Sequence, residues 1–140
     1  MRYAIFADIH SNLEALNAVL EAYLKEDVDY YFCAGDIVGY GANPQECLER
    51  VRDLSIVSVA GNHDWATIDV IDTDSFNNLA VDAISWTKER LTSEAKKYLA
   101  ALPLIFEHQD LTVVHGTLNS PGKFYFTQQL LKSCYIDRKL

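Results

Sequence analysis

An α/β fold with a mostly parallel sheet is predicted by two features of the sequence. Short apolar runs without polar alternation recur early in the chain, as expected for strands that are buried on both faces of a sheet. Segments of helical length separate these runs, which gives the order strand, helix, strand, helix, strand with right-handed crossovers. A chain of 140 residues is also close to the usual size of one soluble domain.

The first strand is predicted at residues 2–7, a run rich in strand-forming residues that stops at Asp8. A helix with a broad apolar face is expected to follow, up to about Glu26. Ser11 is the predicted cap of this helix, because Glu14 three residues later would complete a capping box.

The second strand is predicted at residues 28–35, which form a continuous apolar run. The next helix is expected to begin with Asn43 as its cap and Pro44 in its first position, and to end near Asp53. A third apolar run at residues 55–60 predicts the third strand.

Two further helices and a hairpin are predicted before residue 116. A helix is expected at about residues 74–91, and another one capped by Thr92 or Ser93 should run through Leu102. Two short strands at residues 104–108 and 111–115 would then be joined by a tight turn at Gln109 and Asp110. Residues 65–74 show no clear period, and residues 124–139 give only a weak helical or strand signal.

The charge and the N-terminus exclude several classes of protein. The net charge is −8 with a pI near 4.8, so the basic surface that binds a nucleic-acid backbone is not expected. Three cysteines without a CxxC pair indicate neither a disulfide framework nor a zinc knuckle. The first ten residues resemble neither a signal peptide nor a membrane span, so we expect a cytoplasmic protein without a membrane partner.

Polar side chains follow four of the predicted strands, at the point where each strand ends. In open α/β sheets, ligands bind in the crevice outside the carboxyl ends of the strands. The four strands are therefore expected to deliver these side chains to one edge of the sheet. They are Asp8, His10, Asp36, Asn62, His63, Asp64 and His115.

Oxygen donors mixed with imidazoles are typical ligands of divalent ions such as Mn, Fe or Zn. A soft metal site would instead contain thiolates. One carboxylate, such as that of Asp36, could bridge two ions that lie about 3.5–4 Å apart. Each segment alone has an ordinary structural interpretation, as a helix cap, a turn or a polar loop. Their joint occurrence at strand ends favours a metal site.

Four sequence blocks, in this order, resemble the calcineurin-like metallophosphoesterase superfamily, and its small bacterial branch in particular. The blocks are Asp8-Ile9-His10, Gly35-Asp36-Ile37-Val38-Gly39-Tyr40-Gly41, Gly61-Asn62-His63-Asp64 and Val114-His115-Gly116. The resemblance implies an αββα sandwich, of which this chain would form a part, and two divalent metals drawn from Mn, Fe, Zn or Ni.

The resemblance also implies a role for each site residue. Asp8 and His10 would hold the first metal, Asp36 would bridge both, and Asn62 and His115 would hold the second.

His63 would not bind metal in this scheme. It would face the scissile phosphate as a general acid or as a stabiliser of its charge, and Asp64 would orient the loop that carries it.

The sequence departs from the family pattern after residue 120. The family has a Gly-His-x-His block beyond the Val-His-Gly strand, but no histidine follows His115 here. Residues 1–120 carry a net charge of −11 and residues 121–140 one of +3, so we divide the chain into a metallophosphoesterase core and an atypical tail. The tail is either an altered, shortened ending or a natural variant that packs as a substitute helix.

This departure predicts weakened metal binding, with loss of the second metal first, because each ion would lack one imidazole. An exposed sheet edge and apolar surface are also expected, with homo-oligomerisation as the outcome.

The leading functional hypothesis is a metal-dependent phosphomonoesterase or phosphodiesterase that acts on a small phosphoester through activated water. Tyr40, Asn43 and residues 65–75 are expected near the substrate. The alternative is a metal-binding or interaction domain of the same fold that is inactive or catalytically weak. A Rossmann nucleotide-binding domain is disfavoured, since no GxGxxG follows the first strand.

Overall fold

The computed structural model describes residues 1–109, 111–121 and 135–138. Its first sheet confirms the predicted parallel arrangement, with strand order β1-β2-β3. The strands are β1 (Tyr3–Phe6), β2 (Tyr30–Cys33) and β3 (Val57–Ser58). Strand β3 is shorter than the predicted run, because only two of its residues pair with β2.

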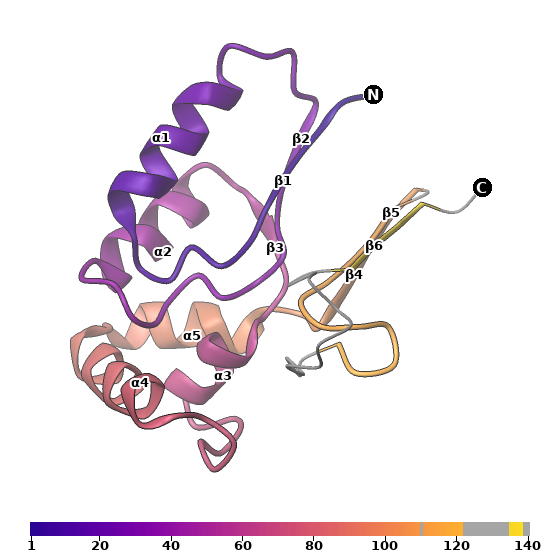
Figure 1. Ribbon diagram of the computed structural model, residues 1–140. Helices are drawn as coiled ribbons and strands as arrows, with labels where there is room; N and C mark the ends of the chain where they lie inside the picture. Colours follow the sequence, from indigo (N-terminus) through magenta and orange to yellow (C-terminus); the bar gives the residue numbers. More distant parts are fainter. Residues whose placement is uncertain (110, 122–134, 139–140) are drawn as a thin grey trace.

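The two predicted crossover helices are α1 (Leu13–Tyr23) and α2 (Pro44–Asp53). They lie on the same side of the parallel sheet (Figure 1). Their apolar faces form the larger core together with residues of the sheet and of the loops that follow β1 and β2. Leu16, Leu20, Leu48 and Val51 are buried in this core.

The predicted cap of α1 is wrong by one residue. Asn12 caps the helix, and its side-chain oxygen accepts a hydrogen bond of 3.0 Å from the backbone N–H of Ala15. Ser11 is instead held in a left-handed conformation (φ 58°), and its N–H donates to the carbonyl of Ile37. The pairing of the loop after β1 with the loop after β2 therefore overrides the capping box.

Three further helices lie together below the sheet in Figure 1. The sequence did not predict α3 (Asn62–Thr67), a short helix that begins directly after Gly61. Helix α4 (Asn78–Arg90) begins later than expected, because the side chain of Asn77 caps it by accepting from the N–H of Ala80. Helix α5 (Ser93–Ala101) is capped by Thr92, one of the two predicted residues.

The predicted hairpin is present, but it belongs to a second, antiparallel sheet. This sheet has the order β4-β5-β6. Its strands are β4 (Ile105–His108), β5 (Leu111–Val114) and β6 (Tyr135–Arg138). His115, which follows β5, is thus not delivered by a fourth strand of the parallel sheet, as the sequence suggested.

Apolar side chains from both sheets form a second core. Phe32, Ala34 and Val59 of the parallel sheet and its strand ends are buried together with Leu111 and Val113 of β5. This contact places the second sheet on the face opposite to α1 and α2, which gives layers of helix, sheet and sheet (Figure 1). It also brings the end of β5 next to the ends of β2 and β3.

The weak signal in the tail corresponds in part to β6 at residues 135–138, while residues 122–134, 139 and 140 lie outside the described part of the chain. The division between residues 120 and 121 therefore stays a prediction.

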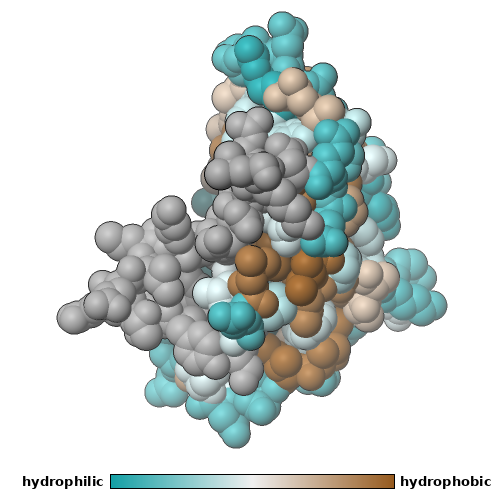
Figure 2. All heavy atoms as spheres, turned by 90° about the vertical axis from the view of Figure 1, so that its right-hand side faces the viewer, coloured by the Kyte–Doolittle hydropathy of each residue, from teal (hydrophilic) through white to brown (hydrophobic). Residues whose placement is uncertain are grey.

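On the side that faces right in Figure 1, apolar side chains gather beside the residues drawn in grey (Figure 2). Association through an exposed sheet edge likewise stays a prediction.

No described helix combines the length and the apolar character that crossing a membrane requires.

The thiol of Cys47 in α2 is buried against the sheet. Burial, reinforced by the charges of Glu46 and Glu14, raises its pKa to about 12. Because only the thiolate reacts, we expect Cys47 to resist iodoacetamide at pH 8 in the native protein and to react fully in guanidinium chloride. Peptide mass spectrometry at Cys47 measures this. Fast native labelling would show that α2 opens readily.

Candidate metal centre

The loops after β1 and β2 run side by side and carry the first site residues. The N–H of Asp8 donates to the carbonyl of Gly35, and the N–H of His10 donates to the carbonyl of Asp36, both at 3.0 Å. Asp8, His10 and Asp36 have left-handed backbones, with φ of 55°, 46° and 54°. Non-glycine residues rarely adopt this conformation, and its cost is typical of functional sites.

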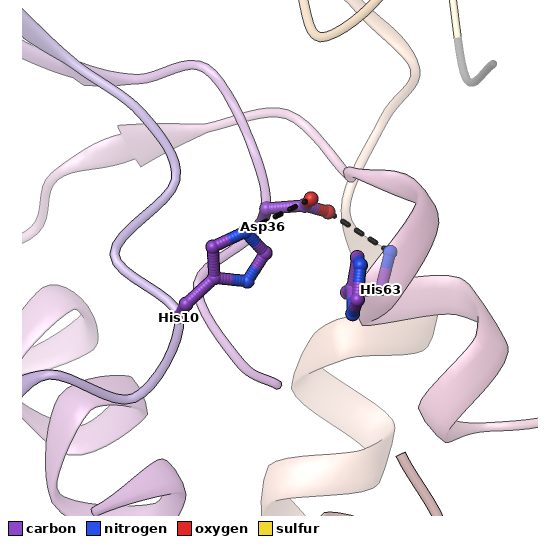
Figure 3. A group of neighbouring side chains, drawn as sticks. All are labelled: His10, Asp36 and His63. Carbon is purple, nitrogen blue, oxygen red and sulfur yellow. Dashed lines mark hydrogen bonds and ion pairs between the residues drawn. The ribbon is translucent and has the colours of Figure 1, made fainter. Parts of the chain in front are cut away.

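Asp36 lies at the centre of the cluster and is almost fully buried, with 2% of its surface exposed. Its Oδ2 lies 3.7 Å from Nε2 of His10 and 3.5 Å from Nε2 of His115. Its Oδ1 accepts a hydrogen bond of 2.9 Å from the backbone N–H of His63. His10, from the loop after β1, and His63, from the start of α3, both lie near this carboxylate (Figure 3).

The two ligand-type histidines are oriented in the same way. Nδ1 of His10 lies 3.2 Å from the carbonyl oxygen of Val38, and Nδ1 of His115 lies 2.8 Å from that of Ala34. A carbonyl oxygen only accepts, so a neutral ring that bonds it through Nδ1–H keeps its Nε2 available to bind a metal ion. This arrangement of outer hydrogen bonds is the usual one for histidines that bind metal.

The donor set fits divalent metal ions. Two groups of ligand atoms, each within 4.8 Å of one another, share Asp36: one contains Asp8 and His115, and the other contains His10 and His63. Two ligands of one metal are expected about 3.0–3.5 Å apart for metal–ligand bonds near 2.1 Å. The separations around Asp36 are close to this range and longer than those of strong hydrogen bonds.

Asn62 completes the cluster at the start of α3. Its Oδ1 lies 3.0 Å from Nε2 of His115, the same nitrogen that lies 3.5 Å from Asp36. All five residues predicted as ligands are therefore neighbours. How they divide between two ions stays a prediction, because the structure also groups His63 with His10 and Asp36.

Burial disfavours charge throughout the cluster. It raises the pKa of Asp36 well above its ordinary value, and the nearby carboxylates of Asp64 and Asp8 add to this shift. It lowers the pKa of His10, although the carbonyl of Val38 and the charge of Asp8 act in the opposite direction. The cluster thus holds buried acids that repel one another, next to imidazole rings. A bound cation would stabilise the charged form of these acids.

Asp64 does not point into the cluster but connects the loops behind it. It is fully buried, and its carboxylate accepts hydrogen bonds from the N–H groups of Val38 at 3.1 Å and Gly61 at 2.9 Å. Burial raises its pKa to about 6, while these backbone donors limit the shift. The orienting role expected for Asp64 stays a prediction.

His63 faces the open side of the cluster. Burial and the nearby imidazoles of His10 and His115 lower its pKa to about 4. Its Nδ1 is buried without a hydrogen-bond partner among the described residues. At neutral pH the ring is therefore neutral in the metal-free protein.

A hollow of about 500 Å³ opens over these side chains, which is within the usual range for small-molecule sites. Asp8, His10, Asp36, Asn62 and His63 line it on one side. Tyr40 and Ser75 line it as the sequence suggested, whereas Asn43 lines a neighbouring hollow. Residues 65–74 do not line this hollow, and the predicted segment ends one residue short of Phe76 and Asn77, which do line it.

The chain belongs to the calcineurin-like phosphoesterase family, whose sequence profile matches residues 1–138. Among the curated proteins, the uncharacterized protein MJ0912 of Methanocaldococcus jannaschii is 52% identical over 104 residues, which cover 74% of this chain and 43% of that protein.

Two solved structures are similar to this chain. A metallophosphoesterase from Sphaerobacter thermophilus is 46% identical, with a TM-score of 0.75 over 90% of this chain and 51% of its own. The hypothetical protein PH1004 from Pyrococcus horikoshii shares the fold at 22% identity, with a TM-score of 0.78 over 91% of this chain and 60% of its own. The chain thus spans about half the length of the relatives it matches.

Proposed function

We propose that the cluster around Asp36 binds two divalent metal ions and that the protein hydrolyses a small phosphoester. The observation that carries this proposal is the position of Asp36, a single buried carboxylate shared by two groups of ligand atoms. Family membership supports a phosphoesterase. Ions bound at such a site supply activation of water and stabilisation of charge on the phosphoryl oxygens.

Five residues of the cluster would hold the ions. Asp8, His10, Asn62 and His115 would hold the ions together with Asp36, and their outer hydrogen bonds would fix their orientation before substrate binds. The metal is expected to be Mn, Fe, Zn or Ni, since the donors are oxygens and imidazoles.

His63 is the residue that we assign to the substrate. Its ring lies at the open side of the cluster and is neutral in the metal-free protein, so it can donate one N–H. A donor in this position would stabilise charge that develops on the phosphoryl or leaving-group oxygen.

The His63→Ala variant is expected to lose at least about 100-fold in kcat toward p-nitrophenyl phosphate or its bis ester with added Mn²⁺, in line with typical contributions of positioned acids and of hydrogen-bond donors. Its affinity for Mn²⁺, measured by calorimetry, should remain within a few-fold of wild type.

The matched control is His108→Ala, which removes a histidine from β4, outside the cluster. It should keep the wild-type rate. Equal rates in His63→Ala and wild type would contradict the proposed role of His63, and a fall in Mn²⁺ affinity with the fall in rate would make His63 a ligand instead.

A second candidate function is metal binding without turnover. The two groups of ligand atoms around Asp36 would support metal binding by themselves, without a substrate. Stoichiometric Mn²⁺ binding by the wild-type chain, with no hydrolysis of either ester above a metal-only blank, would support this alternative over the phosphoesterase.

A further inference from the structure

The side chain of Tyr40 contacts two imidazole rings at the open side of the cluster. The ring of Tyr40 is 4.9 Å from that of His10 and 4.8 Å from that of His63, measured between centroids. Half of Tyr40 nevertheless remains exposed. The ring of Phe76 also lies 5.1 Å from that of His63, in an edge-to-face arrangement.

The loop after β2 holds Tyr40 in an unfavourable backbone conformation. Its backbone is left-handed, with φ of 48°, a conformation that is unfavourable for a bulky residue. The N–H of Gly41 donates to the carbonyl of His10, and a side chain on Gly41 would overlap that same carbonyl. A side chain on Gly39 would come within 2.8 Å of Nδ1 of His63. The backbone on both sides of Tyr40 is therefore closely packed against His10 and His63.

Core packing does not account for this arrangement, because Tyr40 belongs to neither of the two buried apolar clusters of the described residues. The ring borders the hollow over the metal cluster together with Phe76. A ligand whose phosphate lies at Asp36 and His63 would thus have the rings of Tyr40 and Phe76 available to its next chemical group.

We infer that Tyr40 and Phe76 determine specificity by contacting a planar aromatic ring attached to the phosphoester, as in a nucleotide. This inference rests on the proposed function for the place of the phosphate. Stacking of a base on an aromatic side chain is sequence-tolerant and contributes enough to change affinity by about tenfold or more. A phosphoester that carries only a sugar or an alkyl group would lack this contact.

The test compares AMP with ribose 5-phosphate, which has the same sugar and phosphate but no base. Calorimetric Kd values are measured with the Mn²⁺-loaded full chain, and phosphate release is measured in parallel. We expect wild type to bind AMP about tenfold more tightly than ribose 5-phosphate. Phenyl phosphate and cyclohexyl phosphate form a second pair, which shows whether a nucleobase is needed or any planar ring suffices.

Three variants identify the residue responsible. Tyr40→Leu keeps apolar volume without a ring and should reduce the AMP preference to about twofold or less, while the Kd of ribose 5-phosphate stays within twofold. Tyr40→Phe should keep the preference. Tyr30→Leu is the matched control, because Tyr30 is also partly exposed but lies at the start of β2.

Each outcome separates this inference from the proposed function. Hydrolysis of both esters with no preference for AMP, or a preference that Tyr40→Leu leaves intact, would overturn the inference and leave the phosphoesterase standing. A base preference in Kd without any hydrolysis would support the inference and count against the phosphoesterase. Loss of Mn²⁺ binding in Tyr40→Leu would show that the ring supports the ligands rather than the substrate.

Discussion

Replacing Asp36 with asparagine is expected to weaken Mn²⁺ binding by at least about 100-fold. Loss of an outer-shell partner alone costs 10–100-fold in metal affinity, and Asp36 supplies the only carboxylate common to both groups of candidate ligands among the described residues. Asparagine has nearly the same shape, and its amide oxygen can still accept from the N–H of His63. Calorimetric titration with Mn²⁺ measures the loss.

The same variant should be more stable than wild type when metal is removed with EDTA at pH 7. Burial raises the pKa of Asp36 in the folded protein, so its contribution to stability is present at low pH and is lost as the pH rises through that pKa. Asparagine carries no charge and avoids this loss. Urea unfolding measures the difference.

Asp27→Asn is the matched control for both measurements, because Asp27 is exposed and lies before the amino end of β2, away from the cluster. It should leave metal affinity and stability unchanged. An Asp36→Asn variant that binds Mn²⁺ within tenfold of wild type would rule out Asp36 as the bridging ligand.

Replacing Gly61 with alanine is expected to destabilise the protein by about 1–3 kcal/mol, the usual cost of an overpacked site. The added methyl group would overlap the backbone nitrogen and the carboxylate of Asp36. Its carbon would lie only 2.7 Å from Cγ of Asp36. The φ of Gly61 is −96°, which alanine tolerates, so the effect is steric. Urea unfolding at fixed protein concentration measures it.

Mn²⁺ affinity should fall in the same variant, because the overlap can be relieved only by moving Asp36 or the start of α3. Ala42→Ser serves as the control: it also adds one heavy atom, at an exposed position of a neighbouring loop, and should change stability by less than about 0.5 kcal/mol. If Gly61→Ala proves as stable as wild type and binds Mn²⁺ normally, the two loops are less closely packed than the structure indicates.

The site was predictable from sequence because its ligands lie at strand ends, where apolar runs stop abruptly. Asp8 and Asp36 each come soon after a buried strand, and the parallel pairing of β1 with β2 places them side by side. The orientation of the histidines was not predictable. It depends on hydrogen bonds to the carbonyls of Ala34 and Val38, which no local pattern encodes.

The fold was less predictable where tertiary contacts override local preferences. Ser11 and Glu14 have the spacing of a capping box, but the pairing of two loops moves the cap to Asn12. Helix α3 is too short to show a helical period, and its start depends on the bond between Asp64 and the N–H of Gly61. The hairpin was recognised, and the family resemblance implied a sandwich of two sheets. The strand-end pattern nevertheless assigned His115 to the edge of the parallel sheet, because side-chain alternation does not reveal which sheet a strand joins.

The position of His115 on the second sheet links the chemistry of the site to the order of folding. His115 reaches the carbonyl of Ala34, 81 residues earlier in the chain, and its Nε2 lies near Asp36 only when the two sheets are in contact. Such long-range contacts form late, after the local helices and crossovers. An ion bound by both residues would therefore connect the two sheets, and its binding would stabilise their contact by mass action. Chelation would then loosen the hairpin first and leave the helix-covered layer in place.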